Sequence, residues 1–173
     1  MFSSLSRRLL QYLMNRFFLV LREVPSRNAV PRVAVQHNRP EALLTMMSLD
    51  EKIDYISGVE GFSVRGIDRL GIPPVWMSDA TSGVRGVDAP VTAFPCAAAM
   101  AASWNRDLLR SVGDALGSEC RAVGVSVLLG PGVNIARVPI CGRNFEYMGE
   151  DPFLAGELAR AYIEGVQSHR VAV

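Results

Sequence analysis

Continuous apolar runs alternate with amphipathic segments along most of this 173-residue chain. The runs at 73–79 and 124–136 predict buried strands, since they are bounded by proline, glycine or polar residues. Between them, residues 105–124 have helical spacing, a second helix is expected from 151, and a further apolar run begins at 171–173. Strand, helix, strand, helix and the start of a strand form the repeating unit of an α/β fold with parallel strands.

Capping residues mark where the predicted helices begin and end. Asn105 is expected to cap the first long helix and Gly124 to end it. Asp151, followed by proline, starts the second long helix. Ser48 opens an S-x-x-E capping box ahead of a shorter helix that Gly58 ends. The apolar faces expected on the two long helices consist of Leu109, Val112, Leu116 and Cys120, and of Leu154, Leu158, Ala161, Tyr162 and Val166.

The length of the chain limits the architecture that these units can build. A complete (β/α)8 barrel takes roughly 250 residues. The predicted fold is therefore a partial TIM-type (β/α) barrel that has the first few βα units and an irregular or helical N-terminal extension. We expect an apolar and basic segment with a linker over 1–40 and an incomplete domain over 41–173. The open sheet edge of such a fold favours self-association.

Composition excludes several classes of function. A formal charge of +1 offers no net field for nucleic acid. Residues 1–24 are apolar, but their arginines interrupt the apolar run that a membrane span needs. The segment also has no clear cleavage site for export. It therefore offers only a weak case for membrane association or export. Localisation is left open. The three cysteines lack C-x-x-C spacing and are expected to be small buried residues, and we expect no metal and no cofactor.

Two charged residues are expected at the carboxyl ends of strands, where ligands gather in parallel α/β folds. Asp79 ends the first strand and precedes a loop rich in glycine and small residues. Its carboxylate can accept two hydroxyl hydrogen bonds from one sugar ring. Alternatively, Asp79 caps a turn or pairs with Arg85. Arg143 lies in the long loop after the second strand, where its guanidinium can donate to sugar hydroxyls or hold a carboxylate.

Other side chains in these loops are given structural roles. Glu146 and Glu150 invite comparison with a catalytic carboxylate pair, but Gly149 disfavours the helical spacing that such a pair needs, so salt bridges and loop contacts are expected instead. Trp76 and Trp104 are expected in the core rather than stacked on a sugar.

Five motifs occur in an order that resembles a known family. They are LTMMSLDEKIDYISG, RLGIPPVWMSDATSGVRG, TAFPCAAAMAASWN, GVSVLLGPGVNIAR and GRNFEYMGEDPFLAGELARAYIEGVQS. Together they resemble the amino-terminal domain of glycoside hydrolase family 3, which includes β-glucosidases and β-xylosidases. The resemblance runs from about Leu44 to the end of the chain.

This resemblance implies a sugar site without catalytic residues. Asp79 would bind hydroxyls of the terminal sugar and Arg143 would help to form the same subsite, with a β-glycoside or its terminal sugar as ligand. The family hydrolyses O-glycosyl bonds with retention, through a nucleophilic carboxylate and a general acid. Both lie later in the family's sequences, as does a Lys-His pair, so this chain alone is expected to be inactive. The family usually has glycine, proline and histidine where this chain has Ala80, Thr81 and Ser82.

Three hypotheses stay open at this point. The chain is a fragment of a retaining, exo-acting glycoside hydrolase, a non-catalytic carbohydrate-binding or partner module, or an interaction protein that uses residues 1–24 at a membrane.

Overall fold

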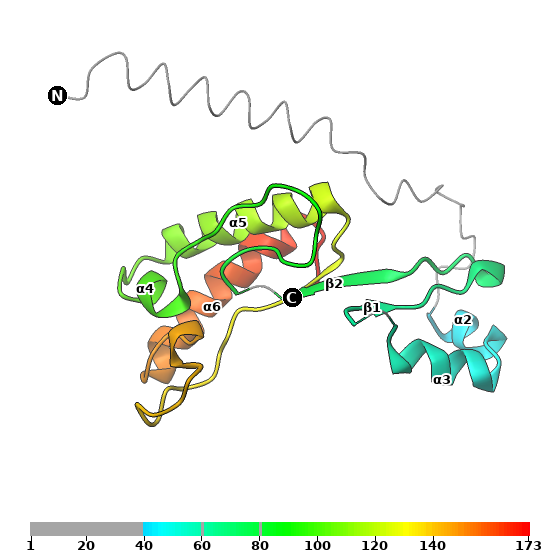
Figure 1. Ribbon diagram of the computed structural model, residues 1–173, viewed down its shortest axis with the longest axis horizontal. Coiled ribbons are helices and arrows are strands. Elements are labelled where there is room, and N and C mark those ends of the chain that lie inside the picture. The colour runs from blue at the N-terminus through cyan, green and yellow to red at the C-terminus, as the bar shows by residue number, and fades with distance from the viewer. Residues whose placement is uncertain (1–39, 60, 80) are drawn as a thin grey trace, which may run out of the picture.

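The computed structural model describes residues 40–59, 61–79 and 81–173 of the chain. The apolar segment and linker predicted before residue 40 lie outside the described residues. Figure 1 shows two long helices side by side next to a small sheet, with two short helices beside the early strands.

Two short helices precede the sheet. The first, α2 (Pro40–Met46), was not predicted, whereas α3 (Leu49–Ser57) and its capping box are confirmed. Ser48 Oγ accepts from the backbone N–H of Glu51 at 3.2 Å, and the Glu51 carboxylate accepts from the N–H of Ser48 at 2.8 Å. Neither helix has a buried residue.

The sheet has the strand order β1-β2-β3, with β1 at Ser63–Val64, β2 at Val75–Asp79 and β3 at Val127–Leu129. The predicted parallel set is confirmed, because β2 pairs with β3 in parallel and Ala172 bridges Val127 in parallel. By contrast, β1 pairs antiparallel with β2, which sequence periodicity did not predict for so short a segment.

Helices α5 (Arg106–Val123) and α6 (Pro152–Gln167) are the predicted long helices, and a short helix α4 (Ala97–Ala101) precedes them. The Asn105 side chain accepts from the N–H groups at the start of α5, and Asp151 does the same for α6. These contacts satisfy donors that have no partner inside the helix.

Glycine lets α5 and α6 approach backbone to backbone. A Cβ atom on Gly117 would lie 2.7 Å from the carbonyl oxygen of Val166, and one on Gly113 would collide with the carbonyl oxygen of Tyr162. Both long helices therefore contribute to one dense core. Its fully buried large side chains include Leu109, Leu116, Cys120, Leu128, Leu158, Tyr162, Val166 and Val171.

The strands are not buried on both faces, contrary to the sequence prediction. Ser78 and Leu128 are buried, but Trp76 and Leu129 are 36% and 40% exposed. The long helices cover one face, and among the described residues no second layer covers the other. This half-covered sheet is what the first few units of a (β/α) barrel leave.

The predicted burial of cysteine and tryptophan side chains is confirmed only in part. Cys120 is buried as expected, whereas Cys141 is exposed. Trp104 is 75% exposed, so its assignment to the core was wrong, as was that of Trp76. The backbone φ of Trp104 is 53°, a value that is rare for a residue other than glycine. Within the residues described, no helix combines the length and hydropathy that a membrane crossing requires.

Candidate functional site

Asp79 is the last residue of β2 and is aligned with Leu129 at the end of β3. Its side chain is exposed at the carboxyl end of the parallel strands. This is the edge at which loops converge and ligands bind in parallel α/β folds. No ion pair joins Asp79 to Arg85 among the described residues, so the structure does not support that alternative role for Asp79.

The loop that follows β2 folds back on itself. The buried Ser78 hydroxyl donates to the Arg85 carbonyl oxygen at 3.0 Å and lies 2.8 Å from the Arg85 nitrogen, whose N–H it can accept. Further along, the Phe94 N–H donates to the Ser82 carbonyl oxygen at 2.8 Å. The Ser78 contacts tie the loop to β2, and the bond between Phe94 and Ser82 joins the returning arm of the loop to its outgoing arm.

Arg143 lies in the long loop between β3 and α6, directly before the 3-10 helix η2 (Asn144–Glu146). The loop is held by a hydrogen bond of 3.0 Å from the Ala136 N–H to the Gly149 carbonyl oxygen. The Asn144 side chain also donates to the Val138 carbonyl oxygen at 2.8 Å. Arg143 is therefore an exposed cation on an internally bonded loop.

The charges at the site act on one another. The hydrogen bond to the Glu146 carboxylate is the main reason why the pKa of Arg143 is raised, and the negative charge of Asp79 adds to the shift. Asp79 and Arg143 therefore lie within electrostatic reach of each other, although one ends β2 and the other belongs to the loop after β3. Their role in binding a sugar stays a prediction.

The two glutamates of the long loop do not act as a pair in this structure. Glu146 accepts a hydrogen bond from Arg143 Nε, which confirms the salt-bridge role expected for it. Glu150 is exposed next to the Asp151 cap. A carboxylate that is already held by a guanidinium orients that guanidinium, so Glu146 is better suited to position Arg143 than to attack a substrate.

Two supporting residues were not found by sequence reasoning. Ser78 is buried under the loop after β2, and Glu119 is a buried carboxylate on α5 whose two oxygens lie 3.2 Å from the Thr92 nitrogen. A signal for Glu119 existed, since it lies three and seven residues after the apolar positions Leu116 and Val112 and so shares their face of the helix. A charged residue on the apolar face of a helix is unusual and indicates a specific partner.

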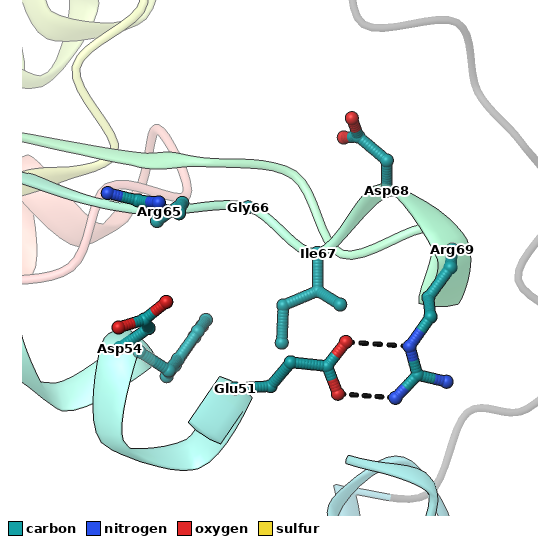
Figure 2. A pocket seen from close by; sticks show the side chains of 8 residues that line it. Glu51, Asp54, Arg65, Gly66, Ile67, Asp68 and Arg69 are labelled. Carbon is teal, nitrogen blue, oxygen red and sulfur yellow. Dashed lines mark hydrogen bonds and ion pairs between the residues drawn. The ribbon is translucent and has the colours of Figure 1, made fainter. Parts of the chain in front are cut away.

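A pocket of about 280 Å³ lies elsewhere, beside α3 and the 3-10 helix η1 (Asp68–Leu70) (Figure 2). It is near the start of β2, whereas Asp79 is at the other end of that strand, about 13 Å away at the usual rise per residue. Figure 2 shows Arg69 joined to Glu51 by two contacts at its rim. In a (β/α) barrel this amino end of the strands supports stability rather than catalysis. The pocket is lined by Glu51, Asp54, Tyr55, Arg65, Gly66, Ile67, Asp68 and Arg69.

In the part of the chain that the structure describes, no three histidine, cysteine, aspartate or glutamate side chains are placed to share a metal ion. The candidate site is thus an arrangement of one carboxylate and one guanidinium above a partial parallel sheet.

The model of the glycosyl hydrolase family 3 N-terminal domain matches residues 29–173. The chain belongs to glycosyl hydrolase family 3. The resemblance predicted from the five motifs is therefore confirmed. The match begins before the predicted boundary near residue 40, and that boundary stays a prediction.

Curated and solved members of family 3 resemble the chain over most of its length. Thermostable beta-glucosidase B of Acetivibrio thermocellus is 46% identical over 140 residues, which cover 75% of this chain and 18% of the relative. A family 3 beta-glucosidase structure from Bifidobacterium adolescentis gives a TM-score of 0.69 at 43% identity, covering 72% of this chain and 18% of that one. Beta-glucosidase 3B from Thermotoga neapolitana gives 0.70 at 37% identity, covering 76% and 22%. The chain spans about a fifth of the length of these family 3 proteins, so it represents part of a family 3 domain.

Proposed function

We propose that the chain supplies part of the terminal-sugar subsite of a retaining, exo-acting β-glycoside hydrolase of the β-glucosidase type. The observation that carries this proposal is the position of Asp79 at the carboxyl end of β2, where β2 pairs in parallel with β3. Arg143 lies in the loop that follows β3, and the negative charge of Asp79 is a minor cause of its raised pKa. The names of the relatives support a β-glucoside as substrate, and the Thermotoga neapolitana enzyme was solved with α-D-glucose.

The chemistry of the two side chains fits a sugar ring. The Asp79 carboxylate can accept hydrogen bonds from two neighbouring hydroxyls, and Arg143 can donate to a further hydroxyl. Glu146 holds Arg143 from one side, which leaves guanidinium donors for a ligand. These contacts would orient the terminal sugar while carboxylates from later parts of a family 3 protein carry out displacement and hydrolysis.

A titration with glucose tests the proposal. We expect saturable binding that Asp79→Ala weakens by about 10- to 150-fold, since a hydrogen bond to a charged group contributes ~1.5–3 kcal/mol. Asp88→Ala is the matched control, because Asp88 is an exposed aspartate of the same loop. Equal loss of binding in both variants would contradict a specific role for Asp79.

We also propose that these 173 residues hydrolyse no glycoside by themselves. The resemblance to family 3 assigns the nucleophile and the general acid to segments beyond the matched region, and loss of a nucleophile removes the covalent pathway. Release of p-nitrophenol from its β-glucoside above the rate of a buffer control would contradict this proposal. Activity that survives Asp79→Ala would point to a contaminating enzyme.

A partner or self-association role is favoured by the sheet edge at residues 171–173. The backbone groups of Ala172 face β3. Its N–H donates to the Ser126 carbonyl oxygen at 2.9 Å, and its carbonyl oxygen accepts from the Leu128 N–H at 2.8 Å. Alternate residues of a strand direct theirs to the other side, where no described strand pairs with them. We expect Val173→Pro to reduce self-association measured by light scattering, while Val173→Ala leaves it unchanged. Membrane association through residues 1–24 stays a prediction.

A further inference from the structure

Glu119 is a buried carboxylate whose position sequence periodicity would assign to an apolar side chain. It is 5% exposed and sits on α5 next to the fully buried Cys120. No ion pair to Glu119 occurs among the described residues, and its carboxylate accepts a hydrogen bond from the backbone N–H of Thr92.

A buried carboxylate with so little compensation costs free energy. Burial of a charged group is unfavourable unless hydrogen bonds or an opposite charge offset it, and an apolar side chain of similar size is often at least as stable. The packing of α5 therefore gives no reason for a glutamate here. The contact with Thr92 does, since both carboxylate oxygens lie 3.2 Å from its nitrogen.

Thr92 lies on the returning arm of the loop that joins β2 to α4. A Cβ atom on Gly83 would lie 2.6 Å from the Thr92 carbonyl oxygen, so the two arms of the loop touch through their backbones at that point. Next to this contact, Phe94 donates to Ser82. The outgoing arm starts directly after Asp79.

We propose that Glu119 is a positioning residue of the terminal-sugar subsite. By accepting the Thr92 N–H, it fixes the loop over 81–94 against α5 and thereby orients the Asp79 carboxylate for the sugar. This inference rests on the proposed function. It extends the site to a residue that touches neither the sugar nor Asp79.

The test combines amide hydrogen exchange with glucose titration on the full 173-residue chain. Glu119→Ala should expose the Thr92 and Phe94 amides to at least about tenfold faster exchange and weaken glucose binding about tenfold, as expected for loss of a charged hydrogen bond. Glu119→Gln keeps one acceptor oxygen and should restore most of both properties. Thr92→Ala keeps the N–H and should change neither.

The outcomes separate this inference from the proposed function. Unchanged exchange at Thr92 in Glu119→Ala would overturn the positioning role. Faster exchange in Glu119→Ala with unaltered glucose binding would overturn it too, provided that Asp79→Ala weakens that binding. If the wild-type chain binds no glucose, the proposed function fails, and exchange at Thr92 and Phe94 still decides whether Glu119 orders the loop. Circular dichroism identifies unfolded variants. If Glu119→Ala unfolds, Glu119→Gln decides instead. Amide exchange and glucose binding equal to those of the wild type support the positioning role. A loss of glucose binding in Glu119→Gln as large as that in Asp79→Ala contradicts it.

Discussion

The α5–α6 pair and the α2–α3 pair are held in place in different ways. The long helices bury a continuous set of apolar side chains and touch through glycine backbones. The short helices bury no residue. An exposed contact between Glu51 and Arg69 links α3 to η1, and Arg69 also donates to the Met46 carbonyl oxygen at 2.9 Å.

This difference separates cooperative stability from local attachment. Apolar burial contributes ~25 cal/mol per Å², whereas an exposed ion pair contributes ~0–1 kcal/mol. We therefore expect the α5–α6 region to unfold as one unit and α2–α3 to open at a lower free energy. Substitutions in the two regions should have very different consequences.

The largest effect is expected from Gly113→Leu. The new side chain would collide with the Tyr162 backbone across the α5–α6 contact, and neither helix can move away without losing the core. We expect the free energy of unfolding in urea to fall by about 3 kcal/mol or more. Gly156→Ala is the control, because a Cβ there meets nothing within 4 Å, and it should raise stability by up to ~1 kcal/mol. A mild effect of Gly113→Leu would show that the helices can separate.

Truncation of a buried leucine comes next. Leu116 is fully buried, so Leu116→Ala should lower the free energy of unfolding by ~2–5 kcal/mol. Ile56 of α3 is 84% exposed, and Ile56→Ala should change it by less than about 0.5 kcal/mol. Similar losses in the two variants, measured by urea denaturation, would contradict the proposed division.

Helix caps give a smaller contrast. Asp151→Ala removes the acceptor for the first turn of α6 and should cost ~1 kcal/mol of global stability. Ser48→Ala removes an equivalent acceptor from α3, where it should speed amide exchange in Leu49–Ser57 and leave the global unfolding transition unchanged. A lowered global midpoint for Ser48→Ala would mean that α3 unfolds together with the core.

The smallest effect is expected from acidification. The hydrogen bond to Arg69 is the largest cause that lowers the pKa of Glu51 from 4.5 to about 2. Because the folded-state pKa is depressed, the contact with Arg69 contributes fully above pH 4.5 and is lost as the pH falls toward 2. Amide exchange in α3, corrected for intrinsic rates, should therefore increase over this range. Glu51→Gln should abolish this pH dependence. If the wild type and the variant respond identically to pH, the contact between Glu51 and Arg69 is not its cause.

Much of the fold was predictable because its signals are local. Asn105, Asp151 and Ser48 each precede a periodic segment, and each caps the expected helix. Continuous apolar runs identified the parallel strands. By contrast, β1 has two residues, too few for alternation to be detected. The exposure of Trp76 and Trp104 depends on which layers surround them, which is a tertiary property.

The candidate site was predictable only in part. The position of Asp79 at a strand end follows from chain order, and motif resemblance added Arg143. Neither method revealed that Asp79 acts on the pKa of Arg143, because that depends on how the loop carrying Arg143 folds toward the end of β2. The helical phase of Glu119 was a signal in the sequence, but its partner could not be deduced, because that partner is a backbone group 27 positions away.

The contrast between two cysteines has a practical consequence. Desolvation, with the charge of Glu119 as a smaller cause, raises the pKa of the Cys120 thiol to about 12, so it stays protonated and unreactive near neutrality. Cys141 is exposed two residues before Arg143. A maleimide dye should attach there in strong preference to Cys120, and Cys96→Ser would remove the half-buried competitor. The Arg143 loop would then carry a fluorescent reporter whose emission follows ligand arrival in real time.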